Sequence, residues 1–444
     1  MLTGVIICFV LGYATIVFEH PLKLDKTVPA LIMGALIWAL ISLGHLNVVG
    51  ADHHIGEMEE VLLHHIGKVA EILFFLIGAM TIVELVDLHK GFSVITNRIK
   101  TTKKSSMLWL IGILAFFLSA TLDNLASTIV LVSLLRRLVP ERTERLWFVS
   151  MAVIAANAGG AWSPIGDVTT TMLWIGEKVS TLGLIKNLVL PSIVCLVVPV
   201  FIASMTKAFR GHITVPGERD VSSALEEEKL LSSRTMLFVG VGALIFVPIF
   251  KSVTHLPPYV GMMLSLGFVW LVSEYIHPEE DFTEERKHLY SAHTALSRIE
   301  MSSILFFLGI LVAVAGLESV AVDHGGGEQV GLLRYMAEQL QAAIPNQDLV
   351  IIILGFLSAI IDNVPLVAAS MGMYTEPMDS QLWHFIAYSA GTGGSMLIIG
   401  SAAGVAAMGM ERIDFIWYLK NVAWLALLGF LAGCFTFIAM NAFF

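Results

Sequence analysis

Two Asp-Asn pairs, Asp123-Asn124 and Asp362-Asn363, interrupt apolar stretches that are long enough to lie in a bilayer. A charged carboxylate at the bilayer centre costs about 2.5–3.5 kcal/mol, so an acid there marks an ion path or a proton relay. A carboxylate, an amide oxygen and carbonyls freed by a helix break can together replace the hydration shell of Na⁺ or Li⁺. Burial favours the protonated aspartate and a bound cation favours the ionised one, so the two would compete. The pairs therefore predict a cation and proton site.

A structural alternative exists for both aspartates. Asp and Asn are favoured helix N-caps, and each pair could simply begin the helix that follows it. The occurrence of the same pair at two interrupted positions favours the functional interpretation, because matched interruptions mark the midplane sites of transporters.

The stretch 146–176 is also interrupted, by Asn157, Gly159-Gly160, Ser163-Pro164 and Asp167 with Thr169 and Thr170. Gly and Pro unwind a helix, and the polar side chains supply oxygens where carbonyls are freed. The stretch 389–401 repeats the pattern with Ser401 in the place of Asp167. Asp167 is therefore predicted to be a third titratable group; the alternative is a buried residue satisfied by its neighbouring threonines.

Around these acids we predict supporting positions that provide oxygens or close backbone contacts. They are Ser119, Ser358, Asn157, Gly160, Ser163, Thr169, Thr170, Thr392, Gly394 and Ser395. Asp123, Asn124, Asp362 and Asn363 are the predicted Na⁺ ligands, and no catalytic residue and no cofactor are predicted.

The composition defines the class of protein that must position these residues. Of 444 residues, 56% are hydrophobic and 14% are charged, with a formal net charge of −10. Soluble domains carry roughly 25% charged residues, so this chain cannot cover a water-facing surface. A soluble enzyme, a secreted disulfide scaffold and a nucleic-acid binder are excluded. The fold class is an all-α polytopic membrane protein.

Ten apolar segments are predicted to cross the membrane: 2–18, 27–46, 70–88, 146–176, 184–205, 234–250, 259–276, 301–319, 382–408 and 413–440. Two further stretches, 105–137 and 348–373, do not fit this scheme. As a single helix, 105–137 would be roughly 50 Å long, well beyond the hydrocarbon core. Each stretch has its Asp-Asn pair near the middle.

Flanking charge indicates that both stretches are re-entrant hairpins. Basic residues lie on both sides of 105–137, from Lys90 to Lys104 and from Arg136 to Arg145, which keeps both ends cytoplasmic by the positive-inside rule. Mainly acidic residues flank 348–373, which predicts entry from outside. Both termini are then outside, in a bacterial-type inner membrane.

Internal repetition supports two inverted halves. Ile72-Leu-Phe-Phe-Leu76 recurs as Ile304-Leu-Phe-Phe-Leu308, and Phe117-Leu-Ser-Ala precedes the first Asp-Asn pair as Phe356-Leu-Ser-Ala precedes the second. We predict one repeat over 1–206, a cytoplasmic linker over 207–233 and a second repeat over 234–444. Each repeat has five crossings and one hairpin, so the second copy is inverted.

Several other ionisable residues lie close to predicted helix ends. Glu84 and Glu318 could line an entry path, but their positions favour side chains that reach back to the interface. The cluster of His53, His54, His64 and His65 is more consistent with a solvated helix than with a pH sensor or metal site.

The hairpin motifs resemble those of NhaD-type sodium/proton antiporters, in the ion transporter superfamily. The resemblance rests on Leu122-Asp-Asn-Leu-Ala-Ser-Thr-Ile-Val130, on Ile361-Asp-Asn-Val-Pro365 and on the Gly-Gly-x-x-Ser-Pro-x-Gly-Asp stretch at 159–167. It implies a scaffold domain, a transport domain that carries both hairpins, a homodimer and elevator-like motion.

Sodium-coupled dicarboxylate transporters of that superfamily carry Ser-Asn-Thr at their hairpin tips. The tips here keep the Asn, replace Ser by Asp and have Leu125 and Val364 in the place of Thr. Added negative charge and a lost hydroxyl disfavour a carboxylate substrate. The second tip ends in Val364-Pro365 and the first in Leu125-Ala126, so two equivalent sodium sites are not expected.

The predicted function is secondary transport, with cytoplasmic Na⁺ or Li⁺ exchanged for external H⁺. The expected partners are small cations, the lipid bilayer and a second copy of the chain, and no nucleic acid. An arsenite, oxyanion or carboxylate carrier of the same superfamily is the first alternative. An intramembrane aspartyl protease is a remote one, because Pro164-Ile-Gly-Asp167 lacks the first Gly of the Gly-x-Gly-Asp motif.

Overall fold

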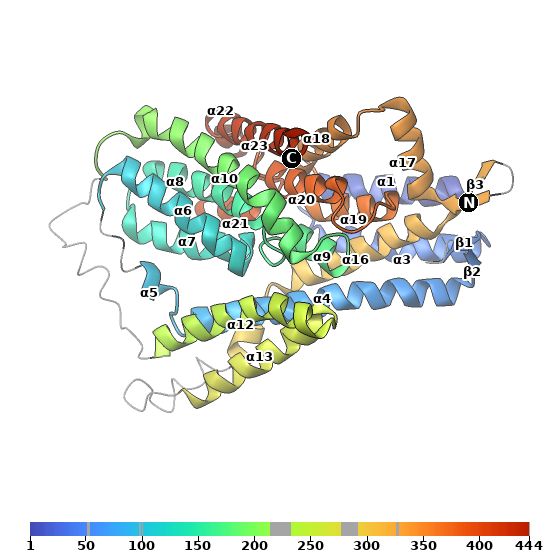
Figure 1. The fold of residues 1–444 in the computed structure, drawn as a ribbon, viewed down its shortest axis with the longest axis horizontal. Helices are drawn as coiled ribbons and strands as arrows, with labels where there is room; N and C mark the ends of the chain where they lie inside the picture. The colour runs from blue at the N-terminus through green and yellow to red at the C-terminus, as the bar shows by residue number, and fades with distance from the viewer. Residues whose placement is uncertain are drawn as a thin grey trace.

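The computed structural model describes residues 1–50, 54–96, 99, 101–213, 232–276, 292–325 and 328–443. Most of the long helices run along the longest axis of the molecule (Figure 1). The helices of the first half are α1 (Leu2–Val17), α2 (Glu19–Leu22), α3 (Thr27–Leu43), α4 (Met58–Leu88), α5 (Ser93–Thr96), α6 (Lys104–Leu122), α7 (Asn124–Leu138), α8 (Arg142–Gly160), α9 (Val168–Ile175) and α10 (Thr181–Met205). Those of the second half are α12 (Ser232–Thr254), α13 (Pro258–Tyr275), α15 (Ala292–Arg298), α16 (Met301–Ser319), α17 (Leu332–Ala343), α18 (Gln347–Ser358), α19 (Asn363–Met373), α20 (Gln381–Gly393), α21 (Ala402–Glu411), α22 (Phe415–Asn421) and α23 (Ala423–Phe443).

The described strands form two small antiparallel pairs. One pair joins β1 (Val48–Val49) to β2 (Ile55–Gly56), and the other joins β3 (Ala321–Gly325) to β4 (Glu328–Gly331). Both pairs lie at the same end of the molecule as the N-terminus (Figure 1). They close connections between helices and contribute no sheet to the core.

The predicted class, an all-α polytopic membrane protein, is confirmed. Among the described residues, six helices are long and apolar enough to cross a membrane: α4, α6, α10, α12, α16 and α23. The pair α17 and α18 is bent by 117° and can be read as a broken span or a re-entrant loop. Shorter apolar helices, α1 and α3 among them, lie beside these spans.

The helix breaks fall where Gly, Pro and polar residues were expected to place them. The predicted crossing 146–176 consists of α8 and α9, separated at 161–167, and the crossing 382–408 consists of α20 and α21, separated at 394–401. The stretch 105–137 is divided into α6 and α7 at Asp123, and 348–373 into α18 and α19 at 359–362. Whether each divided stretch is re-entrant in the membrane stays a prediction.

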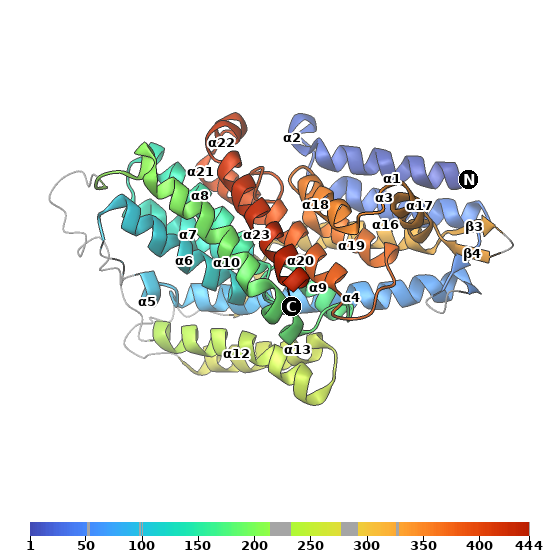
Figure 2. The same cartoon turned by 45° about the horizontal axis from the view of Figure 1, so that its top comes forward.

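Two helix pairs join the first half of the chain to the second. Helix α3 packs against α16, where a Cβ built on Gly34 would lie 2.7 Å from the Gly309 carbonyl oxygen, so the two backbones are in close contact. The second pair is α13 of the second half against α4 of the first half. Helices α12 and α13 lie on one side of α4 in both views (Figure 1, Figure 2).

The structure differs from the sequence prediction at the third crossing. Helix α4 begins at Met58 and not near residue 70, because Glu59 and Glu60 in its first turn are favourable beside the helix N-terminus. His64 and His65 therefore lie within a helix. His53 and residues 214–231 of the predicted linker lie outside the described residues.

Candidate ion-binding site

Asp167 is the centre of a buried polar network. It caps α9, with Oδ1 accepting a hydrogen bond from the Thr169 amide at 2.9 Å. Its second oxygen, Oδ2, accepts from Asn124 Nδ2 at 2.9 Å and from Asn363 Nδ2 at 3.4 Å. Asp167 is only 2% exposed. One carboxylate thus joins the first residues of α7 and α19 to the broken helix α8–α9.

The network continues into the second broken helix. Asn124 Nδ2 also donates to Asn157 Oδ1 at 3.0 Å, and Asn157 Nδ2 donates to Ser401 Oγ at 3.0 Å. Ser401 caps α21 by accepting from the Gly404 amide at 3.1 Å. The matched positions Asp167 and Ser401 therefore both cap a half-helix, but only Asp167 carries a charge.

Glycines allow the broken helices to approach the Asp-Asn segments. A Cβ on Gly159 would lie 2.1 Å from the Phe116 carbonyl oxygen, and one on Gly393 would lie 2.2 Å from the Gly355 carbonyl oxygen. Real Cβ atoms cannot come so close to backbone. Phe116 and Gly355 immediately precede the repeated Phe-Leu-Ser-Ala sequence, so the same contact is built twice from matching residues.

The two aspartates of the Asp-Asn pairs are N-caps, as the structural alternative predicts. Asp123 Oδ1 accepts from the Ala126 amide at 2.7 Å, and Asp362 Oδ1 accepts from the Val364 amide at 3.2 Å. Capping uses one oxygen of each carboxylate, so the other oxygen can have a second role.

The second carboxylate oxygen has a different role in Asp123, at the first tip, and in Asp362, at the second tip. Asp362 Oδ2 forms an ion pair with Lys26 Nζ at 2.9 Å, whereas no cation of the described residues is paired with Asp123. Their backbones also differ, because Asp123 has φ +84° and Asp362 has φ −49°. A non-glycine residue held at positive φ costs roughly 1–3 kcal/mol, which surrounding structure must supply. The two tips are not equivalent.

Asp123 opens onto a cavity of about 1010 Å³ between α4 and α7. Glu84, Asp87, Arg137 and Arg298 line this first cavity together with Asp123. The sequence favoured a Glu84 that reaches to the interface, but the structure places it in the wall beside the candidate site. A second cavity, of about 860 Å³, is lined by residues that include Glu318, so matching acids line different cavities.

Buried hydroxyls without a partner occur on α7, α9 and α20, and Thr169 brings one of them to the network. Within the part of the chain that the structure describes, Ser127 Oγ, Thr128 Oγ1, Thr169 Oγ1 and Ser389 Oγ are buried without a hydrogen-bond partner. A Cβ on Gly391 would lie 3.6 Å from Asp167 Oδ2 and 3.7 Å from Thr169 Oγ1, which places both oxygens beside one point. A hydroxyl oxygen and a carboxylate oxygen are suitable ligands for a small cation.

Most predicted supporting residues brace the backbone through hydrogen bonds or close contacts. Ser119, Ser358, Thr170, Thr392 and Ser395 each donate their hydroxyl to a carbonyl oxygen. Ser163 Oγ accepts from the Ile165 amide, and Gly160 and Gly394 allow close passage of the following loop. Of the supporting set, Asn157 and Thr169 bring side-chain atoms to the network.

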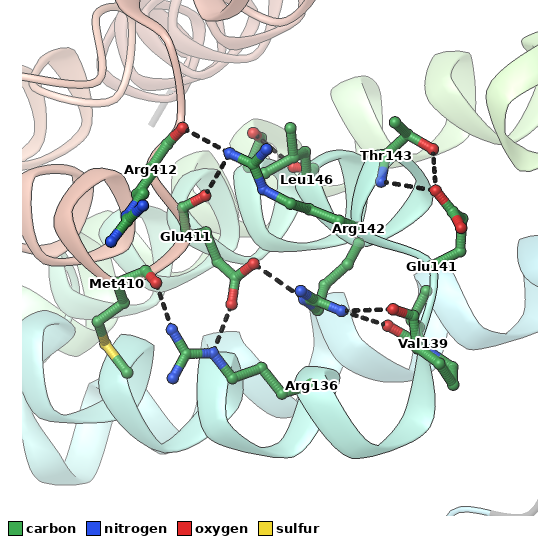
Figure 3. A network of polar contacts seen from close by, with 12 residues as sticks. Arg136, Val139, Glu141, Arg142, Thr143, Leu146, Met410, Glu411 and Arg412 are labelled. Atoms are coloured by element: carbon green, nitrogen blue, oxygen red, sulfur yellow. Dashed lines mark hydrogen bonds and ion pairs between the residues drawn. The ribbon is translucent and has the colours of Figure 1, made fainter.

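Sequence reasoning missed the role of Glu411, which joins the far ends of α7 and α21. Arg136 Nε donates to Glu411 Oε1 at 2.6 Å (Figure 3). Arg145 Nε donates to Glu411 Oε2 at 2.9 Å. Arg136 and Arg145 were interpreted only as determinants of orientation. Because α7 and α21 both begin at the site, this cluster fixes the two half-helices relative to each other.

Comparison with known proteins gives relatives over nearly the whole chain. A family model described as a citrate transporter matches residues 13–385. The chain is 47% identical over 441 residues to sodium/proton antiporter 1 of Arabidopsis thaliana, covering 98% of this chain and 71% of that protein. It is 46% identical over 443 residues to sodium/proton antiporter 2 of the same plant, covering 98% and 99%. The Na⁺/H⁺ antiporter NhaD of Vibrio cholerae is 29% identical over 468 residues, covering 98% and 91%.

Proposed function

Given that the chain belongs to the citrate transporter family, we propose that it is an integral membrane antiporter that exchanges Na⁺ for H⁺. Its relatives at 47%, 46% and 29% identity are named sodium/proton antiporters. The protein is a transporter and not an enzyme, so the protease alternative is set aside. Na⁺ and H⁺ are its substrates, and no cofactor is indicated.

The observation that carries this proposal is the Asp167 carboxylate, which is shared by the amides of Asn124 and Asn363. A buried acid that contacts both Asp-Asn segments and lies beside the Thr169 hydroxyl supplies oxygens of the kind that Na⁺ prefers. When the ion leaves, a proton can neutralise the same carboxylate, because an isolated charge in this setting is costly. Competition at one site couples the two fluxes.

Asp123 is the second acid of the proposed exchange. It borders the first cavity, whereas Asp167 is enclosed, so an ion that enters the cavity meets Asp123 before it reaches the network. Glu84, Asp87 and Glu300 line the cavity with Asp123, and these four acids outnumber its three basic residues by one, which favours cations over anions. From the second tip Asn363 reaches the network, whereas Asp362 is paired with Lys26.

We place the first cavity on the cytoplasmic side, because Arg137 and Arg298 line it. On that basis both termini lie outside, the two hairpins enter from opposite sides, and the repeats 1–206 and 234–444 are inverted copies. The matched contacts of Gly159 and Gly393 support this arrangement. Transport then proceeds by alternating access, with the hairpins and broken helices moving as one elevator-like unit within a homodimer.

A carboxylate carrier is the second candidate, since the family description is a citrate transporter. Asp123, Asp167 and Asp362 bring three acids to the region where an anion would bind. Of these three acids, only Asp362 has a cationic partner among the described residues. Repulsion of the anion disfavours this candidate. The membrane in which the protein resides stays open to experiment, because the relatives include plant proteins.

Proteoliposomes with a preset pH gradient test the proposal. Addition of Na⁺ should dissipate the gradient, citrate should not, and Asp123→Asn should abolish the Na⁺ response. Asp348→Asn is the matched control, because Asp348 lies in the first turn of α18, at the opposite end of that helix from the second tip. Undiminished exchange by the Asp123→Asn protein would refute the assignment of that residue.

A further inference from the structure

Lys26 brings a positive charge to the second Asp-Asn tip. Its Nζ lies 2.9 Å from Asp362 Oδ2 and 4.3 Å from the centre of the Phe306 ring. The ammonium is therefore held by a carboxylate on α19 and an aromatic face on α16. Hydrogen bonds between charged groups at this distance are among the strong ones, and the aromatic face adds to the attraction.

The position of Lys26 is fixed by its neighbours. It is the residue before α3, where Asp25 Oδ1 accepts from the Thr27 amide at 2.8 Å and Thr27 Oγ1 donates to the Ser302 carbonyl at 3.0 Å. The close backbone contact of Gly34 with Gly309 then holds α3 against α16. The packing of α3 on α16 therefore fixes the position of Lys26, which is not a freely moving surface side chain.

Among the described residues, no lysine is paired with Asp123 at the first tip as Lys26 is with Asp362. Helix α13 occupies in the second half the place that α3 occupies in the first, and it is preceded by Pro257 where α3 is preceded by Lys26. Asp123 opens onto the first cavity, whereas Asp362 is not among the residues that line it. Helix α19 packs on α16, while the cavity separates α7 from α4.

We propose that the Lys26 ammonium is a built-in cation for the second tip, so that each chain binds one sodium ion, at the Asp123 side of the network. The inference rests on the proposed function. An ammonium at hydrogen-bonding distance occupies the oxygen that a sodium ion would need, and both carry a single positive charge. The lysine thus neutralises Asp362. The transported cation then binds at Asp123, Asp167 and the asparagine side chains that contact Asp167.

Lys26 is consequently a residue that sets how many sodium ions bind. Replacement of Lys26 by an uncharged side chain frees the Asp362 oxygen and creates a second cation site. Replacement by arginine keeps the positive charge and keeps the site closed. Removal of the Asp362 carboxylate in the wild-type background removes no sodium ligand.

Equilibrium binding of ²²Na⁺ to the purified full-length protein tests the inference. The wild type and the Lys26→Arg protein should bind about one ion per chain, and Lys26→Met should show a roughly twofold increase. The double variant Lys26→Met, Asp362→Asn should return to the wild-type value. If Lys26→Met does not fold, Asp362→Asn alone decides, because the sodium count should stay unchanged with Lys26 in place.

Three outcomes distinguish failure of this inference from failure of the proposed function. A wild type that binds two ions and loses one in Asp362→Asn would overturn the role of Lys26 while leaving sodium exchange intact. A folded Lys26→Met protein that still binds one ion would overturn it as well. A wild type that binds no Na⁺ and shows no Na⁺-dependent proton flux would overturn the proposed function itself.

Discussion

Asp167 Oδ2 and Asn124 Nδ2 lie 2.9 Å apart, and this hydrogen bond joins the break of α8–α9 to the first residue of α7. Through this hydrogen bond, a change in the charge of the Asp167 carboxylate affects the first tip, where Asp123 borders the cavity. An ion or proton that changes the charge of Asp167 changes the strength of its bonds to both Asp-Asn segments. Ion binding can thereby favour one arrangement of these segments over another.

The two asparagines should contribute unequally to sodium affinity. Asn124 donates to Asp167 at 2.9 Å and also to Asn157, whereas Asn363 donates to the same oxygen at 3.4 Å. A hydrogen bond to a charged group is worth about 1.5–3 kcal/mol, so Asn124→Ala should raise the half-saturating Na⁺ concentration about tenfold or more. Asn363→Ala should raise it less. The reverse order in a transport titration would contradict the geometry.

Removal of the Thr169 hydroxyl should weaken sodium binding without weakening the fold. Thr169 Oγ1 has no hydrogen-bond partner among the described residues, so Thr169→Val leaves no protein group unsatisfied. Half-saturation should shift to roughly tenfold higher Na⁺, which corresponds to about 1.4 kcal/mol. Thr170→Val is the matched control, because that hydroxyl donates to the Asp167 carbonyl oxygen, which also accepts from the Thr171 amide. An unchanged titration for Thr169→Val would remove it from the ligand set.

A single methyl group at Gly159 should damage the fold. The added Cβ would lie 2.1 Å from the Phe116 carbonyl oxygen, so α8 and α6 must separate. Overpacking of this kind costs about 1–3 kcal/mol or more, and the melting temperature of the purified protein should fall clearly. Gly242→Ala in α12 is the control, because nothing lies within 4 Å of the added atom. Equal melting temperatures for the two variants would argue against the close packing of α6 and α8.

Glu411 should make stability depend on pH. Burial raises the pKa of this carboxyl, but hydrogen bonds from Arg136 and Arg145 outweigh that effect, so its pKa lies below the ordinary value. Because Glu411 follows the predicted crossing 382–408, it lies outside the predicted membrane-spanning segments. A depressed pKa means that the stabilisation is present above the ordinary pKa of about 4.3 and is lost as pH falls through the folded value.

Melting curves of the wild type and Glu411→Gln measure this effect. Breaking a fully buried ion pair costs about 3–5 kcal/mol, but Arg136 is partly exposed, so the loss here should be smaller, and the variant should still melt below the wild type at neutral pH. The difference should narrow at pH values near and below 4. A constant difference across that range would show that the charge of Glu411 is not what stabilises the cluster.

Features that depend on local sequence were predictable. The breaks at Asp123, at 161–167 and at 394–401 follow from Gly, Pro and capping residues whose effects act within a few positions. The pairing of Lys26 with Asp362 was not predictable, because it spans 336 residues and depends on how α3, α16 and α19 pack. Basic residues beside a crossing, such as Lys26, Arg136 and Arg145, are usually interpreted as signals that set the orientation in the membrane. Only the fold reveals what these charges touch.

Uptake of ²²Na⁺ into proteoliposomes that are acidic inside tests the central claim most directly. Outward proton flow should drive accumulation of Na⁺ by the wild type, the accumulation should collapse when the pH gradient is dissipated, and Asp167→Asn should show none. Accumulation that is independent of the pH gradient, or that persists in Asp167→Asn, would contradict exchange of Na⁺ and H⁺ at this carboxylate.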